Sequence, residues 1–323
     1  MAEPSNAFVL GLRQRGEPTR RRARGSSNRR RRAFGYALLA PMVLMLLGFI
    51  YVPLVDAVRT SLTDASLATP GSNYVGLRQY RDLLHDSRFW QIFYQTVIYT
   101  AVSVVGSLVL GVLAAVWLRG ATRISPFLRA IMLVPWIAPP LVAAFMWSYL
   151  YRDTGPLGQL AHTLGLTGQQ PVDFLSDRNA VAGIAVAFMA VIQVGIWAGF
   201  PFVFLFALAA LSAIPNEVYE AARLDGAGAF ALFRWITLPL IAPVLETTAL
   251  LLTIIRFGGA DLPFLLTGGG PGDTTSVFGV LIYNTAFGSL DSSRAAALGV
   301  MVFVLTLPLS IVYVRRSMRQ MRP

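Results

Sequence analysis

The stretch that decides the fold runs from Glu220 to Pro239 and reads EAARLDGAGAFALFRWITLP. It carries several charged residues, yet it lies between two long apolar segments of the chain. Pro215, just before it, suits the first turn of a helix, because its missing N–H is no loss there. Glu217 and Glu220 fall near the positive end of that helix. A short charged helix is therefore predicted between two hydrophobic segments.

The small residues of this stretch indicate what the helix is for. Ala221 and Ala222 keep one helix face flat. Gly226 can end or kink the helix, and because it has no side chain, another protein could approach the backbone closely. These features favour a docking surface over a catalytic site.

Composition places the chain in a membrane. Of the 323 residues, 55% are hydrophobic and only 13% are charged, whereas soluble domains carry about 25% charged residues. All 27 basic residues are arginines. A phosphate-binding loop of the type G-x-x-x-x-G-K-[ST] requires its lysine, so this chain cannot itself contain that ATP site. With no cysteine, disulfides and thiolate metal sites are excluded.

Residues 1–33 hold ten arginines among Gly, Ser and Pro. Such a segment has little apolar surface to bury, so we predict a disordered tail. A nucleic-acid-binding tail is one interpretation. Arginines directly before a membrane segment more often set topology and contact lipid headgroups. We prefer this second interpretation, so membrane lipids are the predicted partner and nucleic acid is not.

Six apolar segments follow, each near or above the roughly 20 residues that cross a bilayer. They are Phe34–Val55, Ile92–Leu118, Phe127–Tyr151, Val181–Leu211, Leu240–Phe257 and Ala295–Val314. Pro135, Pro139 and Pro140 should break the third segment near its middle. The fourth is too long for one straight span and has places to bend at Gly195, Gly199 and Pro201. The prediction is an all-α integral membrane protein with six transmembrane helices and a cytoplasmic coupling helix.

The arginines also predict an orientation. With the N-terminus in the cytoplasm, nineteen of the 27 basic residues lie on the cytoplasmic side, as the positive-inside rule requires. We therefore predict a multi-pass protein of the bacterial cytoplasmic (inner) membrane with both termini in the cytoplasm. The predicted domains are the tail (1–33), a transmembrane domain (34–316) that contains the coupling loop (214–239), and a cytoplasmic C-terminal tail (317–323).

The spacing of the decisive stretch resembles a known signature. The pattern EAA, three residues, Gly, nine residues and I-x-L-P is that of the EAA loop in permease subunits of bacterial ATP-binding-cassette importers. ITLP together with LLTGGGP (Leu265–Pro271) is similar to the carbohydrate-uptake branch, which includes maltose-type and glycerol-phosphate-type permeases. The resemblance implies a coupling role toward an ATPase for Glu220, Ala221, Ala222, Asp225, Gly226, Ile236, Leu238 and Pro239.

The residues themselves point to a polar site near the outer end of the fifth span. Arg256 is followed by Gly258, Gly259 and Asp261, so the helix should unravel there and expose backbone groups beside two charges. Sugar hydroxyls pair with such groups, and sugar rings stack on aromatic faces. Trp136 and Trp197 could supply those faces.

The resemblance implies substrate contacts in the same regions. Maltose-type permeases contact sugar before LLT-x-GGP, after the VP or LP of the third span, and at W-x-G-x-P of the fourth. In this chain those positions are Trp136, Pro140, Trp197, Gly199, Ile255, Arg256 and Gly259. Asp261 is added because the wider carbohydrate-uptake branch commonly has an aspartate at this position. Maltose-type sequences have asparagines where this chain has Arg256 and Gly259, so its contacts should differ.

Structural interpretations stay open for these residues. Arg256 and Asp261 could simply pair with each other, and Trp136 and Trp197 could face lipid or pack in the core. Glu246, within the fifth span, should need a partner, perhaps on another subunit. His85 and His162 lie in separate predicted external loops without a carboxylate pattern, so no metal site is predicted.

These observations lead to one functional hypothesis. The chain is expected to be a permease subunit that pairs with a second, related permease to enclose a path for a sugar or sugar-like solute. Two ATPase subunits would bind ATP and Mg²⁺, so this chain would need no cofactor and would not be an enzyme. An extracytoplasmic solute-binding protein would deliver the solute. The alternatives are a stand-alone, ion-coupled secondary transporter and an intramembrane enzyme acting on lipid-linked sugars.

Overall fold

The computed structural model describes residues 24–69, 71–119, 125–165, 170–177, 179–181 and 184–320. The chain divides into two compact units, Met1–Asp56 and Ala57–Pro323. Each unit is described by itself. Most of the predicted N-terminal tail, residues 1–23, and the last residues of the predicted C-terminal tail, 321–323, lie outside the described part of the chain.

The first unit is helical throughout its described residues. Helix α1 spans Arg24–Leu46 and contains Pro41, a π-helical turn η1 follows at Leu47–Tyr51, and helix α2 begins at Val52 and ends at Ser61, beyond the unit boundary. Residues 24–33 are thus helical, where the sequence predicts disorder. Arginine is a good helix former, and a helix that is already nucleated in an apolar span extends at little cost per residue.

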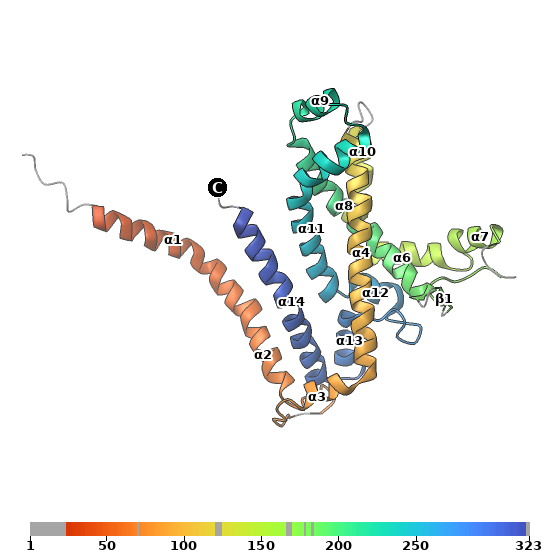
Figure 1. Ribbon diagram of the computed structural model, residues 1–323. Coiled ribbons are helices and arrows are strands. Elements are labelled where there is room, and N and C mark those ends of the chain that lie inside the picture. Colours follow the sequence, from red (N-terminus) through yellow and green to blue (C-terminus); the bar gives the residue numbers. More distant parts are fainter. Residues whose placement is uncertain are drawn as a thin grey trace, which may run out of the picture. The chain divides into compact units, whose positions relative to one another are not determined.

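The second unit is a bundle of long helices with short helices at its ends (Figure 1). A two-stranded antiparallel hairpin, β1 (Ala180–Val181) and β2 (Ile184–Ala185), is the only sheet among the described residues. The further helices are α3 (Arg78–His85), α4 (Ser87–Arg119), α5 (Ser125–Ile137), α6 (Pro140–Tyr151), α7 (Pro156–Thr163), α8 (Val186–Ser212), α9 (Asn216–Leu224), α10 (Ala229–Ala231), η2 (Leu232–Thr237), α11 (Leu238–Gly258), α12 (Asp261–Thr267), α13 (Phe278–Tyr283), η3 (Asn284–Gly288) and α14 (Ser292–Gln320).

The number of membrane spans agrees with the prediction. Five helices in the described part of the chain are long and apolar enough to cross a membrane, and the total is six if a bent pair of helices is counted as one span. The five single spans are Tyr36–Ser61, Ser87–Arg119, Val186–Ser212, Ala229–Gly258 and Ser292–Arg316. The all-α membrane fold is confirmed.

The third span is broken where its prolines predict. The helical segments 126–137 and 140–163, the second of which contains α6 and α7, meet at an angle of 96°. Pro139 is the residue before the second helix, and Pro140 is its first residue. A proline is favoured at that position, but it disfavours helical geometry in the residue before it. Pro135 lies inside α5 and does not end it.

The fourth span is shorter than predicted, because its first residues form the β1–β2 hairpin. Helix α8 begins at Val186, not at Val181, and continues through Pro201 to Ser212. The periodicity of a short apolar run does not distinguish a strand from a helix, so the sequence placed Val181 in the helix.

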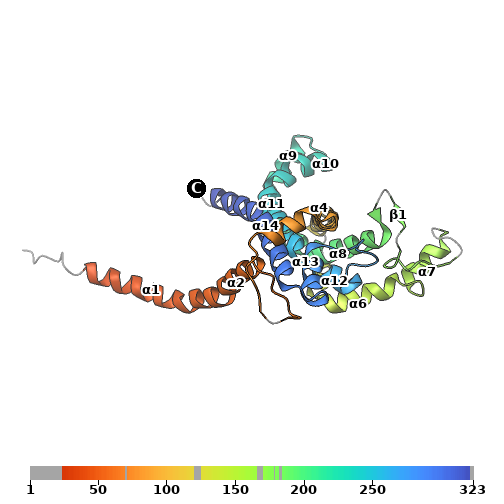
Figure 2. The same ribbon diagram turned by 90° about the horizontal axis from the view of Figure 1, so that it is seen from below.

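Helices α4 and α8 form the centre of the second unit, and glycines let them approach closely. A Cβ atom added at Gly106 would lie 2.5 Å from Ile196 Cδ1, and one at Gly111 would lie 2.6 Å from Val203 Cβ. Small residues at a helix interface allow this approach in membrane proteins. Viewed along the bundle, α12 and α6 lie beside α8 (Figure 2).

Glu246 finds its partner within this chain. Its Oε2 accepts a hydrogen bond from Arg316 Nη1 of α14 at 2.8 Å, and both side chains are about half exposed. The expected partner of Glu246 is therefore on α14 of the same chain. Sequence alone did not place the last turns of α14 beside the middle of α11.

Candidate functional site

A cavity of about 280 Å³ lies where the break in the third span meets α8, α11 and α12. Its walls combine prolines and apolar side chains with one arginine and one aspartate. They are Pro135, Trp136, Ala138, Pro140, Ala143, Ala198, Gly199, Phe202, Leu252, Ile255, Arg256, Asp261 and Leu262. Six of the eight predicted substrate-path residues are in this list: Trp136, Pro140, Gly199, Ile255, Arg256 and Asp261. A mainly apolar cavity with a few polar groups is the usual form of a small-molecule site.

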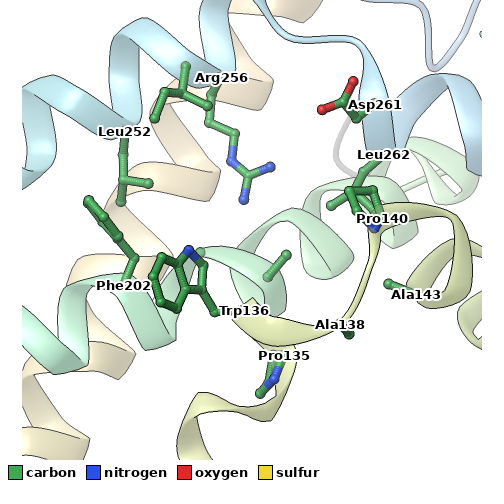
Figure 3. Close-up of a pocket in the computed structure, with 13 residues that line it drawn as sticks. Pro135, Trp136, Ala138, Pro140, Ala143, Phe202, Leu252, Arg256, Asp261 and Leu262 are labelled. Atoms are coloured by element: carbon green, nitrogen blue, oxygen red, sulfur yellow. The ribbon is translucent and has the colours of Figure 1, made fainter.

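Arg256 is held against α8 by a single hydrogen bond. Its Nη2 donates to the carbonyl oxygen of Gly195 at 2.9 Å. A guanidinium has five N–H groups. The Tyr99 hydroxyl group of α4 also interacts with this guanidinium. Figure 3 shows the guanidinium extending from α11 toward the middle of the cavity, with Trp136 and Asp261 on two sides of it. Arg256 therefore retains most of its hydrogen-bonding capacity.

Asp261 begins α12, just after the break in the chain that the glycines predict. Helix α11 ends at Gly258, and Gly259 has extended backbone angles. The exposed Asp261 carboxylate forms no ion pair or hydrogen bond with any described residue, so it does not pair with Arg256. A cation and an anion that do not form an ion pair with each other thus border one cavity.

Trp136 gives the cavity an aromatic face. Its side chain is 53% exposed, and its ring centroid lies 6.2 Å from that of Phe202 on α8. It sits two residues before the proline break, which turns the chain away and leaves the indole uncovered. An exposed indole beside charged hydrogen-bonding groups is suited to a sugar ring.

Two predicted site residues do not line the cavity. Trp197 points into the core, where its ring packs edge-on against Trp147 with centroids 5.5 Å apart. Gly259 is part of the break between α11 and α12, and a Cβ there would lie 2.6 Å from the Ile255 carbonyl oxygen. Both residues shape the site indirectly.

Sequence reasoning missed several residues that shape the cavity. Phe202 and Leu252 line it, and Gly195 supplies the carbonyl group that holds Arg256. Helix spacing offered a signal for two of them, because Gly195 and Phe202 lie four residues before and three residues after Gly199, on the same helix face. The same rule applies to Leu252, which lies three residues before Ile255 and four before Arg256 in α11.

Gly199 provides the space through which Arg256 reaches α8. A Cβ at this position would lie 2.5 Å from Ser107 Oγ and 3.3 Å from Arg256 Nη2. We expect Gly199→Ala to lower uptake several-fold, because overpacking of this kind costs about 1–3 kcal/mol. Uptake by membrane vesicles measures the effect. The second change Ser107→Gly should restore part of the activity, and full activity of Gly199→Ala alone would contradict the close packing.

The second candidate site is the short charged helix α9 and the turn that follows it. Glu220, Ala221 and Asp225 are exposed, and Ala222 is half-buried. The sequence predicts Pro215 in the first turn of this helix. In the structure Pro215 directly precedes the helix, because its ψ of 144° is extended.

Gly226 ends α9 in the way the sequence predicts. Its φ is +86°, its N–H donates to the Arg223 carbonyl at 3.0 Å, and the N–H of Ala227 donates to the Ala222 carbonyl at 2.9 Å. This pair of hydrogen bonds is the Schellman motif, which places a left-handed residue directly after a helix. Nothing lies within 4 Å of a Cβ added at Gly226. Glycine is therefore required here by backbone conformation, and the surface above it is open.

The rest of the coupling signature leads from α9 into α11. Ile236 and Leu238 are half-buried and Pro239 is exposed. Ile236 belongs to the π-helical turn η2, Leu238 begins α11, and Pro239 lies in the first turn, where proline is tolerated. The same helix, α11, ends beside Arg256. One helix therefore connects the two candidate sites over about 27 Å, at 1.5 Å per residue.

Comparisons with known proteins agree on one family. The family described as binding-protein-dependent transport system inner membrane component matches residues 107–320. The trehalose/maltose transport system permease protein MalF of Thermococcus litoralis is 34% identical over 281 residues, which are 87% of this chain and 92% of that protein. The sn-glycerol-3-phosphate transport system permease protein UgpA of Salmonella choleraesuis is 32% identical over 288 residues, 88% and 94% of the two chains.

A solved structure shares the fold. A chain in the crystal structure of a bacterial alginate ABC transporter, in complex with an alginate pentasaccharide-bound periplasmic protein, superposes with a TM-score of 0.77 at 21% identity. The superposition covers 93% of this chain and 99% of that one. The chain belongs to the family of inner membrane components of binding-protein-dependent transport systems.

Proposed function

We propose that this chain is one of two related permease subunits of an ATP-binding-cassette importer and that the pair encloses the path of a carbohydrate or carbohydrate-like solute. Two ATPase subunits bind ATP and Mg²⁺, and a solute-binding protein delivers the solute from outside. Both termini and α9 face the cytoplasm in this proposal. The excess of arginines on that side supports the orientation.

The cavity carries the proposal about the solute. The Arg256 guanidinium and the Asp261 carboxylate together offer donors and acceptors to hydroxyl groups, and the Trp136 indole offers an apolar face to a ring. In the relatives' own names the solutes are trehalose or maltose and glycerol 3-phosphate. Arg256 favours a solute with an anionic group over a neutral one only weakly, because Asp261 opposes its charge.

The coupling role of α9 rests on its exposure and on its sequence. The eight predicted coupling residues lie between the middle of α9 and the first turn of α11, two helices joined through α10 and η2 (Figure 1). Beside the exposed charges of Glu220 and Asp225, the Leu224 side chain is 89% exposed. An exposed leucine between charges is typical of a docking surface. We propose that Glu220 meets a basic residue of the ATPase.

The experiment is an uptake assay. The chain is co-expressed with its companion permease and ATPases, reconstituted into vesicles and supplied with radiolabelled maltose, trehalose or sn-glycerol 3-phosphate together with the companion binding protein. ATP-dependent accumulation of at least one solute supports the proposal. Accumulation driven by an ion gradient with the ATPases absent would establish the ion-coupled alternative, which family membership disfavours.

A further inference from the structure

Helix α9 has a single large side chain that is half-buried. None of its nine residues is fully buried, and only Tyr219 and Ala222 are half-buried. Residues three apart lie on the same helix face, so these two define the inner face of α9. Since Ala222 has only a methyl group, Tyr219 is the main contact between the helix and its support.

The face of the Tyr219 ring receives a cation from α4. The Cζ atom of Arg119, the last residue of α4, lies 4.1 Å from the ring centroid, which is well within the range of a cation–π contact. The same guanidinium donates from Nη2 to the Ile214 carbonyl oxygen at 3.1 Å. Ile214 belongs to the link between α8 and α9, so Arg119 holds both the helix and the chain that leads into it.

The other end of the Tyr219 side chain contacts η2. The Tyr219 hydroxyl oxygen lies 3.2 Å from Thr237 Oγ1. The Thr237 hydroxyl group in turn donates to the Leu232 carbonyl oxygen at 3.2 Å. Thr237 is only 5% exposed. One side chain thus has two separable contacts, its ring with α4 and its hydroxyl group with η2.

The surroundings of this contact are largely open. Arg119 and Tyr219 line a cavity of about 500 Å³, together with residues of α8, α9 and η2. The Arg119 guanidinium and the Tyr219 ring make contact beside this cavity, which three more polar side chains of α9 also line. These are Asn216, Glu220 and Arg223. A force on α9 would reach α4 through the contact between Arg119 and Tyr219.

Helix α4 is well placed to carry a displacement onward. It has 33 residues, about 50 Å at 1.5 Å per residue. Near its middle, Ser107 borders Gly199 of the Arg256 cavity. At its far end, Arg88 donates from Nε and Nη2 to the two carboxylate oxygens of Asp273 at 2.8 and 2.9 Å. The helix is therefore attached at both ends and passes the candidate solute site between them.

We propose that Arg119 and Tyr219 form a joint through which movement of α9 displaces α4, and that coupled transport depends on this joint. They are positioning residues, since neither borders the solute cavity. The inference rests on the proposed docking of the ATPase at α9 and adds the route by which that movement enters the membrane helices.

Transport stoichiometry tests the joint. In the reconstituted complex, we expect Tyr219→Leu and Arg119→Gln each to lower the solute moved per ATP hydrolysed at least fivefold, with maltose as the first solute used. Tyr219→Phe keeps the ring and loses only the hydroxyl group, so it should stay within twofold of the wild type. The double variant should be no worse than either single variant, because both remove the same contact. Wild-type stoichiometry in Tyr219→Leu, or equal defects in Tyr219→Phe and Tyr219→Leu, would overturn the proposal.

A second measurement needs no solute and separates the joint from the proposed function. The chain lacks cysteine, so spin labels can be attached in the full complex after Trp117→Cys on α4 and Asn216→Cys on α9. With the joint intact, we expect the separation between the two labels to be the same without nucleotide and with ATP and vanadate, because α9 and α4 move together. Once Tyr219→Leu is added, we expect the separation to differ between these two conditions. If the label separation changes with nucleotide while Tyr219 is present, the proposal is overturned. It is also overturned if the separation stays the same with nucleotide after Tyr219→Leu. Absence of uptake by the wild type would refute only the proposed function.

Discussion

Replacing Arg256 with alanine is expected to weaken solute uptake about 10- to 100-fold, seen as a higher KM or a lower rate. The guanidinium donates to the Gly195 carbonyl, interacts with the Tyr99 hydroxyl group and lines the cavity. Hydrogen bonds to charged groups contribute about 1.5–3 kcal/mol, and each 1.4 kcal/mol corresponds to about a tenfold change in affinity. Initial rates of uptake over a range of solute concentrations measure the effect.

Two controls make the Arg256 result specific. Arg256→Lys keeps the charge but loses the planar set of donors, so it should fall between the wild type and alanine. Arg78→Ala removes an exposed arginine of α3, away from the cavity, and should leave uptake unchanged. If Arg256→Ala transports like the wild type while the complex assembles normally, Arg256 supports α8 and does not contact solute.

Replacing Gly226 with valine is expected to lower the affinity of the permease pair for its ATPases about 5- to 30-fold. The left-handed conformation at this position, with φ of +86°, costs a residue with a side chain about 1–2 kcal/mol, and it is least compatible with a β-branched residue. The end of α9 would unwind and displace Asp225 and the turn beyond it. Titration of the purified permease pair with ATPase measures the affinity.

The chain contains a matched control two residues later. Gly228 is also exposed and has open space around its Cα, but its φ is −73°. Gly228→Val should therefore have little effect. Gly226→Asn should be milder than Gly226→Val, since asparagine tolerates the left-handed region. Equal losses in Gly226→Val and Gly228→Val would attribute the defect to crowding of the docking surface instead of backbone strain.

Local chemistry explains why much of the fold was predictable. Apolar length located the six spans, because a bilayer requires about 20 apolar residues for each helix. Pro139 and Pro140 located the 96° break, and the glycines after Arg256 located the break between α11 and α12. Gly226 located the end of α9. Each of these features depends on residues adjacent in sequence.

Features that depend on distant residues were predicted less well. Trp197 and Trp136 looked alike as aromatic residues beside glycine or proline, but only Trp136 lines the cavity, because Trp147 of α6 packs against Trp197. Glu246 was expected to need a partner, but its sequence neighbourhood did not identify Arg316, which lies 70 positions away. Helix periodicity fixes the face on which a residue lies but not the helix that faces it.

The sequence by itself determined that this is a helical membrane protein with a short charged helix between its fourth and fifth spans, because hydrophobic length, proline and glycine act locally. Only the tertiary structure decided which polar groups keep free hydrogen-bonding capacity. The packing of α11 against α8 places Arg256 beside the Gly195 carbonyl and not in an ion pair with Asp261. The position of α9 beside the end of α4 places Arg119 over the Tyr219 ring. These pairings follow from the packing of whole helices, which no short stretch of sequence specifies.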